Sequence, residues 1–145
     1  MSEFYIPTES EEQQLLFDFC MRVRYKYPEL DMLVHTPNEG KRNVYNGARL
    51  KREGLRKGFP DISLYCPVGR YHGLMIEMKR KKGSTITKEQ KEWIEKLNAQ
   101  GYAAVFAYGC EQAWDVIEKY LTGKTETLTK YVEKSIEICR KGKKK

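Results

Sequence analysis

Apolar and polar residues alternate in two neighbouring runs, residues 62–64 and 73–79, which are separated by the break Pro67-Val68-Gly69. Alternation with a period of two is typical of a half-buried strand, and Pro and Gly between two such runs indicate a loop. The pattern therefore predicts two antiparallel strands joined by a loop. Because successive strand side chains point to opposite faces, Glu77 and Lys79 share one face and lie about 7 Å apart along it.

A helical period governs most of the remaining chain. The predicted helices cover residues 9–27, 45–56 and 127–140, together with two segments marked by the apolar residues Trp93, Ile94 and Leu97 and by the stretch 113–121. Two short apolar runs, residues 30–36 and 102–108, are expected to be strands. Helices and short strands therefore follow one another along the chain.

The helix at 9–27 and the one that contains Trp93 carry recognisable start signals. Ser10 is the expected N-cap of the first helix, and Glu12 projects onto the apolar face of that helix, whereas Glu11 lies about 100° away. Compensation of the helix dipole explains both glutamates equally well. Thr87 and Gln90 have the spacing of a capping box, which gives Gln90 a structural role without any functional one.

The composition is that of one globular domain of 145 residues without an internal repeat or an interdomain linker. No apolar run reaches the roughly 20 residues of a membrane span, and the polar N-terminus lacks the form of a signal peptide, so we expect a cytoplasmic protein. The cysteines are widely separated and predict neither a zinc site nor a disulfide. They are Cys20, Cys66, Cys110 and Cys139.

Positive charge is concentrated at particular places. The net charge is +7, and residues 122–145 hold eight basic residues against three acidic ones. Two further basic clusters flank residues 59–79, and clustered cations beside carboxylates are suited to a phosphate backbone. A solvated surface remains the alternative for each cluster. The candidate phosphate contacts are Arg42, Arg49, Lys51, Arg52, Arg56, Lys57, Arg80, Lys81 and Lys82.

Asp61, Glu77 and Lys79 form the candidate catalytic set. If Asp61 opens the strand antiparallel to residues 73–79, its carboxylate converges with that of Glu77. Mg²⁺ prefers oxygen ligands and is commonly held by one or two carboxylates beside a substrate phosphate, and a nearby lysine can orient a water. The pattern therefore favours phosphodiester hydrolysis, although an exposed, solvated strand face would produce the same spacing.

Several segments taken together resemble a VRR-NUC domain, a branch of the PD-(D/E)XK nuclease superfamily, and in particular the stand-alone members of phages and bacteria. The resemblance covers residues 9–121 and leaves 1–8 as an N-terminal extension and 122–145 as a basic C-terminal helix and tail. It implies an α/β fold of the PD-(D/E)XK type, with a mixed central β-sheet flanked by helices. The matching segments are ESEEQ, HTPNEGKRN, ARLKREGLRKGFPD, GLMIEMKRKKG, TKEQKEWIEKL and QGYAAVFAYGCEQAWDVIEKYL.

The resemblance also implies roles for individual residues. Asp61 and Glu77 would bind the metal together with the backbone carbonyl of Met78, where a β-branched residue is commoner in the family. Lys79 falls on the motif lysine, and Gln90 on a glutamine close to the active site. Glu12 matches the acid of the first helix and would support the metal directly or through water, with Glu11 as the alternative.

We therefore expect a Mg²⁺- or Mn²⁺-dependent DNA endonuclease, and the resemblance implies a homodimer that acts on branched DNA such as four-way junctions or flaps. Such an enzyme would work in the cytoplasm of a bacterial or phage-infected cell. Two alternatives remain, a non-catalytic DNA-binding module and a nuclease that acts on single-stranded DNA or RNA. No base-reading motif is visible, so recognition is expected to depend on shape and charge.

Overall fold

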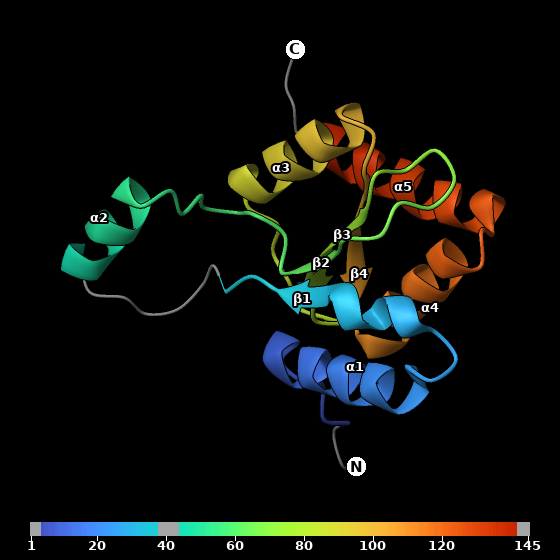
Figure 1. Cartoon of the computed structure of the whole chain (residues 1–145). Coiled ribbons are helices and arrows are strands. Elements are labelled where there is room, and N and C mark those ends of the chain that lie inside the picture. Colours follow the sequence, from blue (N-terminus) through green and yellow to red (C-terminus); the bar gives the residue numbers. More distant parts are fainter. Residues whose placement is uncertain (1–3, 38–43, 142–145) are drawn as a thin grey trace.

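The computed structural model describes residues 4–37 and 44–141, and its centre is a four-stranded mixed sheet (Figure 1). The strand order is β1-β2-β3-β4, with antiparallel pairing from β1 to β3 and parallel pairing between β3 and β4. The predicted hairpin is thereby confirmed as β2 and β3. The strands are β1 (Leu33–His35), β2 (Ile62–Leu64), β3 (Leu74–Lys79) and β4 (Ala103–Tyr108).

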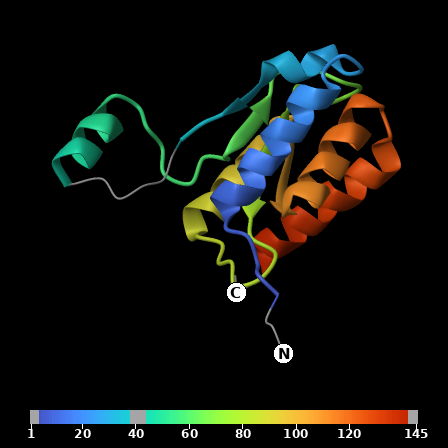
Figure 2. The ribbon, with the colours of Figure 1, turned by 90° about the horizontal axis from the view of Figure 1, so that it is seen from below.

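Helices cover both faces of this sheet (Figures 1 and 2). Helices α1 (Glu9–Val23) and α4 (Cys110–Leu121) pack on the face formed by Leu74, Ile76 and Met78. Helix α3 (Lys88–Ala99) covers the opposite face beside Met75. Helix α5 (Thr125–Arg140) contributes buried residues to both sides of the core. All six residues of β3 are buried, and this strand pairs with β2 on one side and with β4 on the other.

Three details differ from the sequence-based expectation at the N-terminal side. Thr8 rather than Ser10 caps α1, because the Thr8 hydroxyl accepts the hydrogen bond from the Glu11 backbone N–H. The helix ends at Val23 instead of residue 27. The predicted strand at 30–36 is shorter, because a 3₁₀-helix, η1 (Pro28–Met32), starts at the proline and leaves only β1 in extended conformation.

Helix α2 (Val44–Arg52) stands away from the body of the molecule at the end of an extended connection (Figures 1 and 2). The helix was predicted over residues 45–56, and Gly54, with φ of 109°, accounts for its earlier end. This arrangement leaves a short basic helix as a projecting arm.

The C-terminal helix was predicted over residues 127–140 and begins two residues earlier, at Thr125. It buries Leu128, Val132, Ser135 and Cys139, so it belongs to the packed core. The four cysteines are all free thiols, and burial raises the pKa of Cys20 to about 12. Among the described helices, none is both long and apolar enough to cross a bilayer.

Side chains close the outer edge of β4. Its outward-facing backbone N–H groups at Ala104, Phe106 and Tyr108 each donate to a side-chain oxygen, at 3.0, 3.1 and 2.8 Å. The acceptors come from three different helices and are Asn98, Ser135 and Gln112. An additional strand would find these donors already in use, so the sheet does not extend past β4.

Candidate active site

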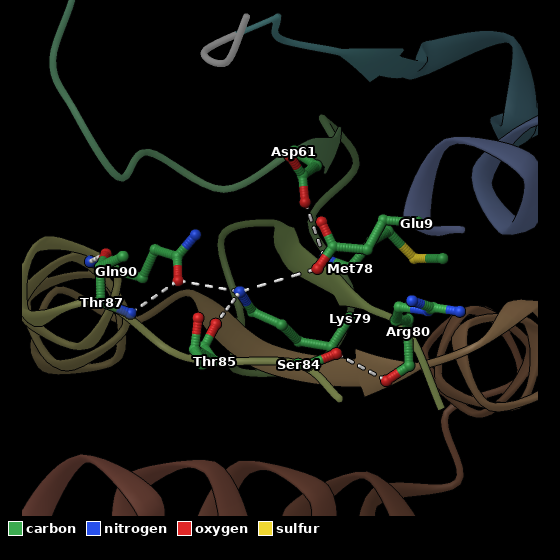
Figure 3. Close-up of polar contacts among 9 residues, drawn as sticks. All are labelled: Glu9, Asp61, Met78, Lys79, Arg80, Ser84, Thr85, Thr87 and Gln90. Atoms are coloured by element: carbon green, nitrogen blue, oxygen red, sulfur yellow. Dashed lines mark hydrogen bonds and ion pairs between the residues drawn. The ribbon is translucent and has the colours of Figure 1, made fainter. Parts of the chain in front are cut away.

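The hairpin brings Asp61 and Glu77 to the same end of the sheet. Ile62 pairs with Ile76, so the preceding Asp61 faces Glu77 across the two antiparallel strands. Strand β2 begins only at Ile62, and the backbone N–H of Met78 therefore donates to the Asp61 side chain, 2.8 Å from Oδ2 (Figure 3). The expected convergence of the two carboxylates follows from this register.

The backbone of Met78 also faces Asp61. Gly109 N–H donates to the carbonyl of Lys79, so that carbonyl points toward β4. Neighbouring residues in a strand direct their backbone groups to opposite sides, and Met78 therefore directs its carbonyl away from β4, toward the side of Asp61. The role of this carbonyl as a metal ligand stays a prediction.

Lys79 is a buried cation with a defined set of partners. Its side chain is 4% exposed, and Nζ donates to the carbonyl of Thr85 at 2.7 Å and to Oε1 of Gln90 at 2.9 Å. The carboxylate of Glu9 lies 3.9 Å from the same nitrogen (Figure 3). A buried ammonium is costly unless it is paired and hydrogen-bonded, so these contacts hold its position.

Gln90 serves α3 and Lys79 at once. Its Oε1 accepts from the backbone N–H of Thr87 at 2.9 Å, while its own N–H donates to the Thr87 hydroxyl at 3.2 Å. The predicted capping box is confirmed, and the same oxygen binds Lys79. The start of α3 and the orientation of the lysine therefore depend on one side chain.

The first turn of α1 supplies acids to the site. Glu12 is 2% exposed, as its position on the apolar face predicted, and lies 3.9 Å from Nζ of Lys81. Glu11 instead accepts a hydrogen bond from Tyr5, and this bond, with those from Thr8, lowers its pKa. The inward acid is therefore Glu12. Gly109, beside Glu12, has a φ of 89°, a conformation that favours glycine.

Two site residues were missed by the sequence reasoning. Glu9 contacts Lys79, and its spacing of three from Glu12, which places both on one helix face, was the available signal. His35 is exposed, and its Nδ1 lies 2.8 Å from the Asp61 carbonyl. This contact joins β1 to the residue before β2, and no local pattern indicates it.

The segment before Asp61 is fixed on the first turns of α3. Trp93 Nε1 donates to the carbonyl of Lys57 at 3.1 Å, and Phe59 packs edge-on against the Trp93 ring at 5.0 Å. Gly58 has a φ of 83°, and a Cβ there would lie 2.6 Å from the backbone of Glu89. The approach to Asp61 therefore requires glycine and is tied to the helix that carries Gln90.

The donors at this end of the sheet fit a hard divalent cation. The described residues include no group of three or more His, Cys, Asp or Glu side chains arranged around a metal. A metal held here would have the carboxylates of Asp61 and Glu77 and the carbonyl of Met78 as its protein ligands. Oε2 of Glu12 is buried and makes no hydrogen bond within the described part of the chain. Oxygen donors, with acceptor capacity to spare, match Mg²⁺ or Mn²⁺.

The candidate DNA contacts lie on the arm and on the loop after β3. Those that are exposed are Arg49, Lys51, Arg52, Arg56, Lys57, Lys81 and Lys82. Arg80 is half-buried and donates from Nη2 to the carbonyl of Ile6 at 2.8 Å, so it anchors the N-terminal segment. Arg42 lies outside the residues that the structure describes. The role of each in DNA binding stays a prediction.

Comparison with known proteins agrees with this geometry. The VRR-NUC domain matches residues 9–111, within the region of the resemblance. A solved structure called a VRR_NUC domain protein is 35% identical, with a TM-score of 0.72, and the match covers 82% of this chain and 92% of that one. No curated protein matches the chain. The chain therefore belongs to the VRR-NUC domain family, a family of nucleases, and has the PD-(D/E)XK-type α/β fold predicted from its sequence.

Proposed function

We propose that this protein is a Mg²⁺- or Mn²⁺-dependent endonuclease that hydrolyses phosphodiester bonds in branched DNA. The observation that carries the proposal is the meeting of Asp61, Glu77 and Lys79 at one end of β3, with Lys79 buried and held by Gln90. Acidic oxygens for a cation and a fixed ammonium are the groups that metal-assisted hydrolysis of a phosphodiester requires.

Asp61, Glu77 and the Met78 carbonyl would hold the ion, and Glu12 would support it directly or through water. Such an ion polarises the phosphoryl oxygen and lowers the pKa of a bound water. The hydrogen bond from the Met78 backbone N–H holds the Asp61 carboxylate in place before any ion binds, which reduces the rearrangement needed for metal binding.

Lys79 positions the attacking water and offsets negative charge that develops on the phosphate. Two of its three N–H donors are directed to Thr85 and Gln90, and the third, with the Glu9 carboxylate 3.9 Å from the nitrogen and beyond hydrogen-bond distance, is left for a water. The water oxygen attacks phosphorus and loses its proton to solvent. The bond from phosphorus to the leaving oxygen breaks, and that oxygen takes up a proton.

The basic arm and the loop after β3 would contact DNA through its phosphates. The exposed cations of α2 and Lys57 precede Asp61, while Lys81 and Lys82 follow Lys79, so the two groups adjoin the site from both sides in sequence. Contacts to phosphates do not read the base sequence, so a protein that binds mainly through them recognises the shape of the DNA. A homodimer would present two such sites to the two equivalent strands of a junction.

Cleavage of labelled four-way junction, flap and linear duplex DNA, with Mg²⁺, Mn²⁺ or EDTA, tests the proposal. We expect metal-dependent cuts at the branch, and we expect Asp61→Ala to abolish them while retaining binding in a gel-shift assay. Binding without product in either metal would instead favour a non-catalytic DNA-binding module. Preferential cutting of single-stranded DNA or RNA would contradict the branched substrate.

A further inference from the structure

Two aromatic side chains are presented to solvent directly before α1. Phe4 is 96% exposed and Tyr5 is 72% exposed, which is unusual for large apolar rings. Neither belongs to the described core, so neither ring is explained by folding. Two fully or largely exposed aromatic residues in succession are more typical of a binding surface than of an inert one.

The segment that carries these rings is fixed. The Tyr5 hydroxyl donates to Oε1 of Glu11, and Arg80 donates from Nη2 to the carbonyl of Ile6 at 2.8 Å. Ile6 is half-buried, and Thr8 caps the following helix. These contacts tie the segment to both α1 and the end of β3, so Tyr5 is held in place before any ligand binds, and Phe4 precedes it directly in the chain.

Arg80 connects this segment to the active site. It follows Lys79 directly in the chain, and its hydrogen bond to the carbonyl of Ile6 anchors the segment beside the end of β3. In the first turn of α1, Glu9 lies 3.9 Å from Lys79, while Glu11, which faces away from Glu9, holds Tyr5. Figure 3 shows Glu9 and Arg80 beside Lys79.

We propose that Phe4 and Tyr5 form a stacking platform for an unpaired base of the DNA substrate, an inference that rests on the proposed function. Aromatic rings beside cations are the combination that binds single-stranded nucleic acid, with rings stacking on bases and cations contacting phosphates. Lys81 and Lys82 are exposed after Arg80 and supply the charge. A flap or an opened junction provides unpaired bases next to the cut, whereas intact duplex does not.

The test uses a flap that carries the fluorescent base 2-aminopurine at its first unpaired position, with wild-type protein in EDTA so that no cleavage occurs. Stacking on an aromatic ring quenches this base. We expect at least twofold quenching with wild type and none with the double variant Phe4→Leu/Tyr5→Leu, which keeps apolar bulk but removes both rings. The affinity for the flap should fall about tenfold, with that for blunt duplex unchanged.

Tyr25→Leu is the matched control, because Tyr25 is 85% exposed but follows the far end of α1. The Tyr25→Leu variant should quench the 2-aminopurine fluorescence as strongly as wild type does. The platform would be overturned if the double leucine variant quenched the 2-aminopurine fluorescence as strongly as wild type does. It would also be overturned if Tyr25→Leu lost as much quenching as the double variant. Cleavage of the same flap in Mg²⁺ or Mn²⁺ is measured separately. If the flap is cut but its fluorescence does not change in EDTA, the platform alone is rejected. If the fluorescence is quenched but the flap is not cut, only the proposed nuclease activity is rejected.

Discussion

Two polar clusters in this molecule are built from similar side chains but differ in how fully they are satisfied. The Asp115 cluster joins α4 to α5 and consists of Asp115, Lys119 and Tyr131. The Lys79 cluster lies at the end of β3 and consists of Glu9, Glu12, Lys79, Lys81 and Gln90. Each contains lysine and carboxylate groups at least partly removed from solvent.

In the Asp115 cluster both carboxylate oxygens accept a hydrogen bond, one from Lys119 at 2.8 Å and one from Tyr131. The bond from Lys119 and that from Tyr131 lower the pKa of Asp115. Burial, together with Asp115, raises the pKa of Tyr131 to about 12. Because both oxygens of Asp115 accept hydrogen bonds, the cluster is fixed in one geometry and stabilises the contact between α4 and α5.

In the Lys79 cluster the two ion pairs are long, both 3.9 Å, and Oε2 of Glu12 is buried without a hydrogen bond in the described part of the chain. A folded protein that needed these groups only for stability would satisfy them more closely. The difference assigns the Asp115 cluster to the fold and is consistent with the proposed role of Glu12 in supporting a metal ion. Four predictions test this contrast.

The largest expected effect comes from removing the ammonium in each cluster. Lys79→Met should lower the single-turnover cleavage rate by about 10³-fold or more, because the water loses its positioning group. Lys119→Met should leave that rate within about twofold. Equal cleavage rates for Lys79→Met and Lys119→Met on the same branched substrate would show that the two clusters do not differ in function.

The second prediction concerns metal addition. At a concentration of 100 times its Kd, Mn²⁺ should stabilise the wild-type fold by about 2.7 kcal/mol, seen as a rise in Tm. Asp61→Asn should abolish most of this rise because it removes a proposed ligand. Asp115→Asn should retain it. A rise in the Asp61→Asn variant as large as in wild type would place the ion elsewhere.

Glu12→Gln should separate activity from stability. The substitution removes a buried negative charge whose ion pair with Lys81 is long and half-exposed, so stability should be unchanged or higher by about 1 kcal/mol. Cleavage should fall more than tenfold if Glu12 supports the metal. Denaturant unfolding and a rate assay on one preparation measure both quantities, and a parallel loss of the two would assign Glu12 to the fold.

The smallest effect is expected for Asp115→Asn, about 1 kcal/mol of stability at neutral pH, since the carboxylate is 38% exposed and solvent weakens its interactions. The depressed pKa of Asp115 means that its contribution is present above the ordinary aspartate pKa and is lost as the pH falls through the folded-state value. The stability difference from wild type should thus be constant from about pH 5 to 8 and shrink below about pH 4. A difference that grows on acidification would contradict this assignment.

Much of the fold was predictable because the signals are local. The period of two identified β2 and β3, the capping box fixed the start of α3, and the helical period placed Glu12 inward. The errors arose where local signals compete. Thr8 and Ser10 are both acceptable caps, and the apolar run after Pro28 suits a short strand or a 3₁₀-turn equally well.

The sequence by itself determined which residue types could perform the chemistry, since the family motif and strand alternation single out Asp61, Glu77 and Lys79. Only the tertiary structure decided which groups meet them. Gln90 reaches Lys79 because α3 packs on the sheet, and Glu9 reaches it because α1 begins at the same end of β3. Such contacts join residues distant along the chain. Their geometry is set by packing and strand register, which no local period encodes.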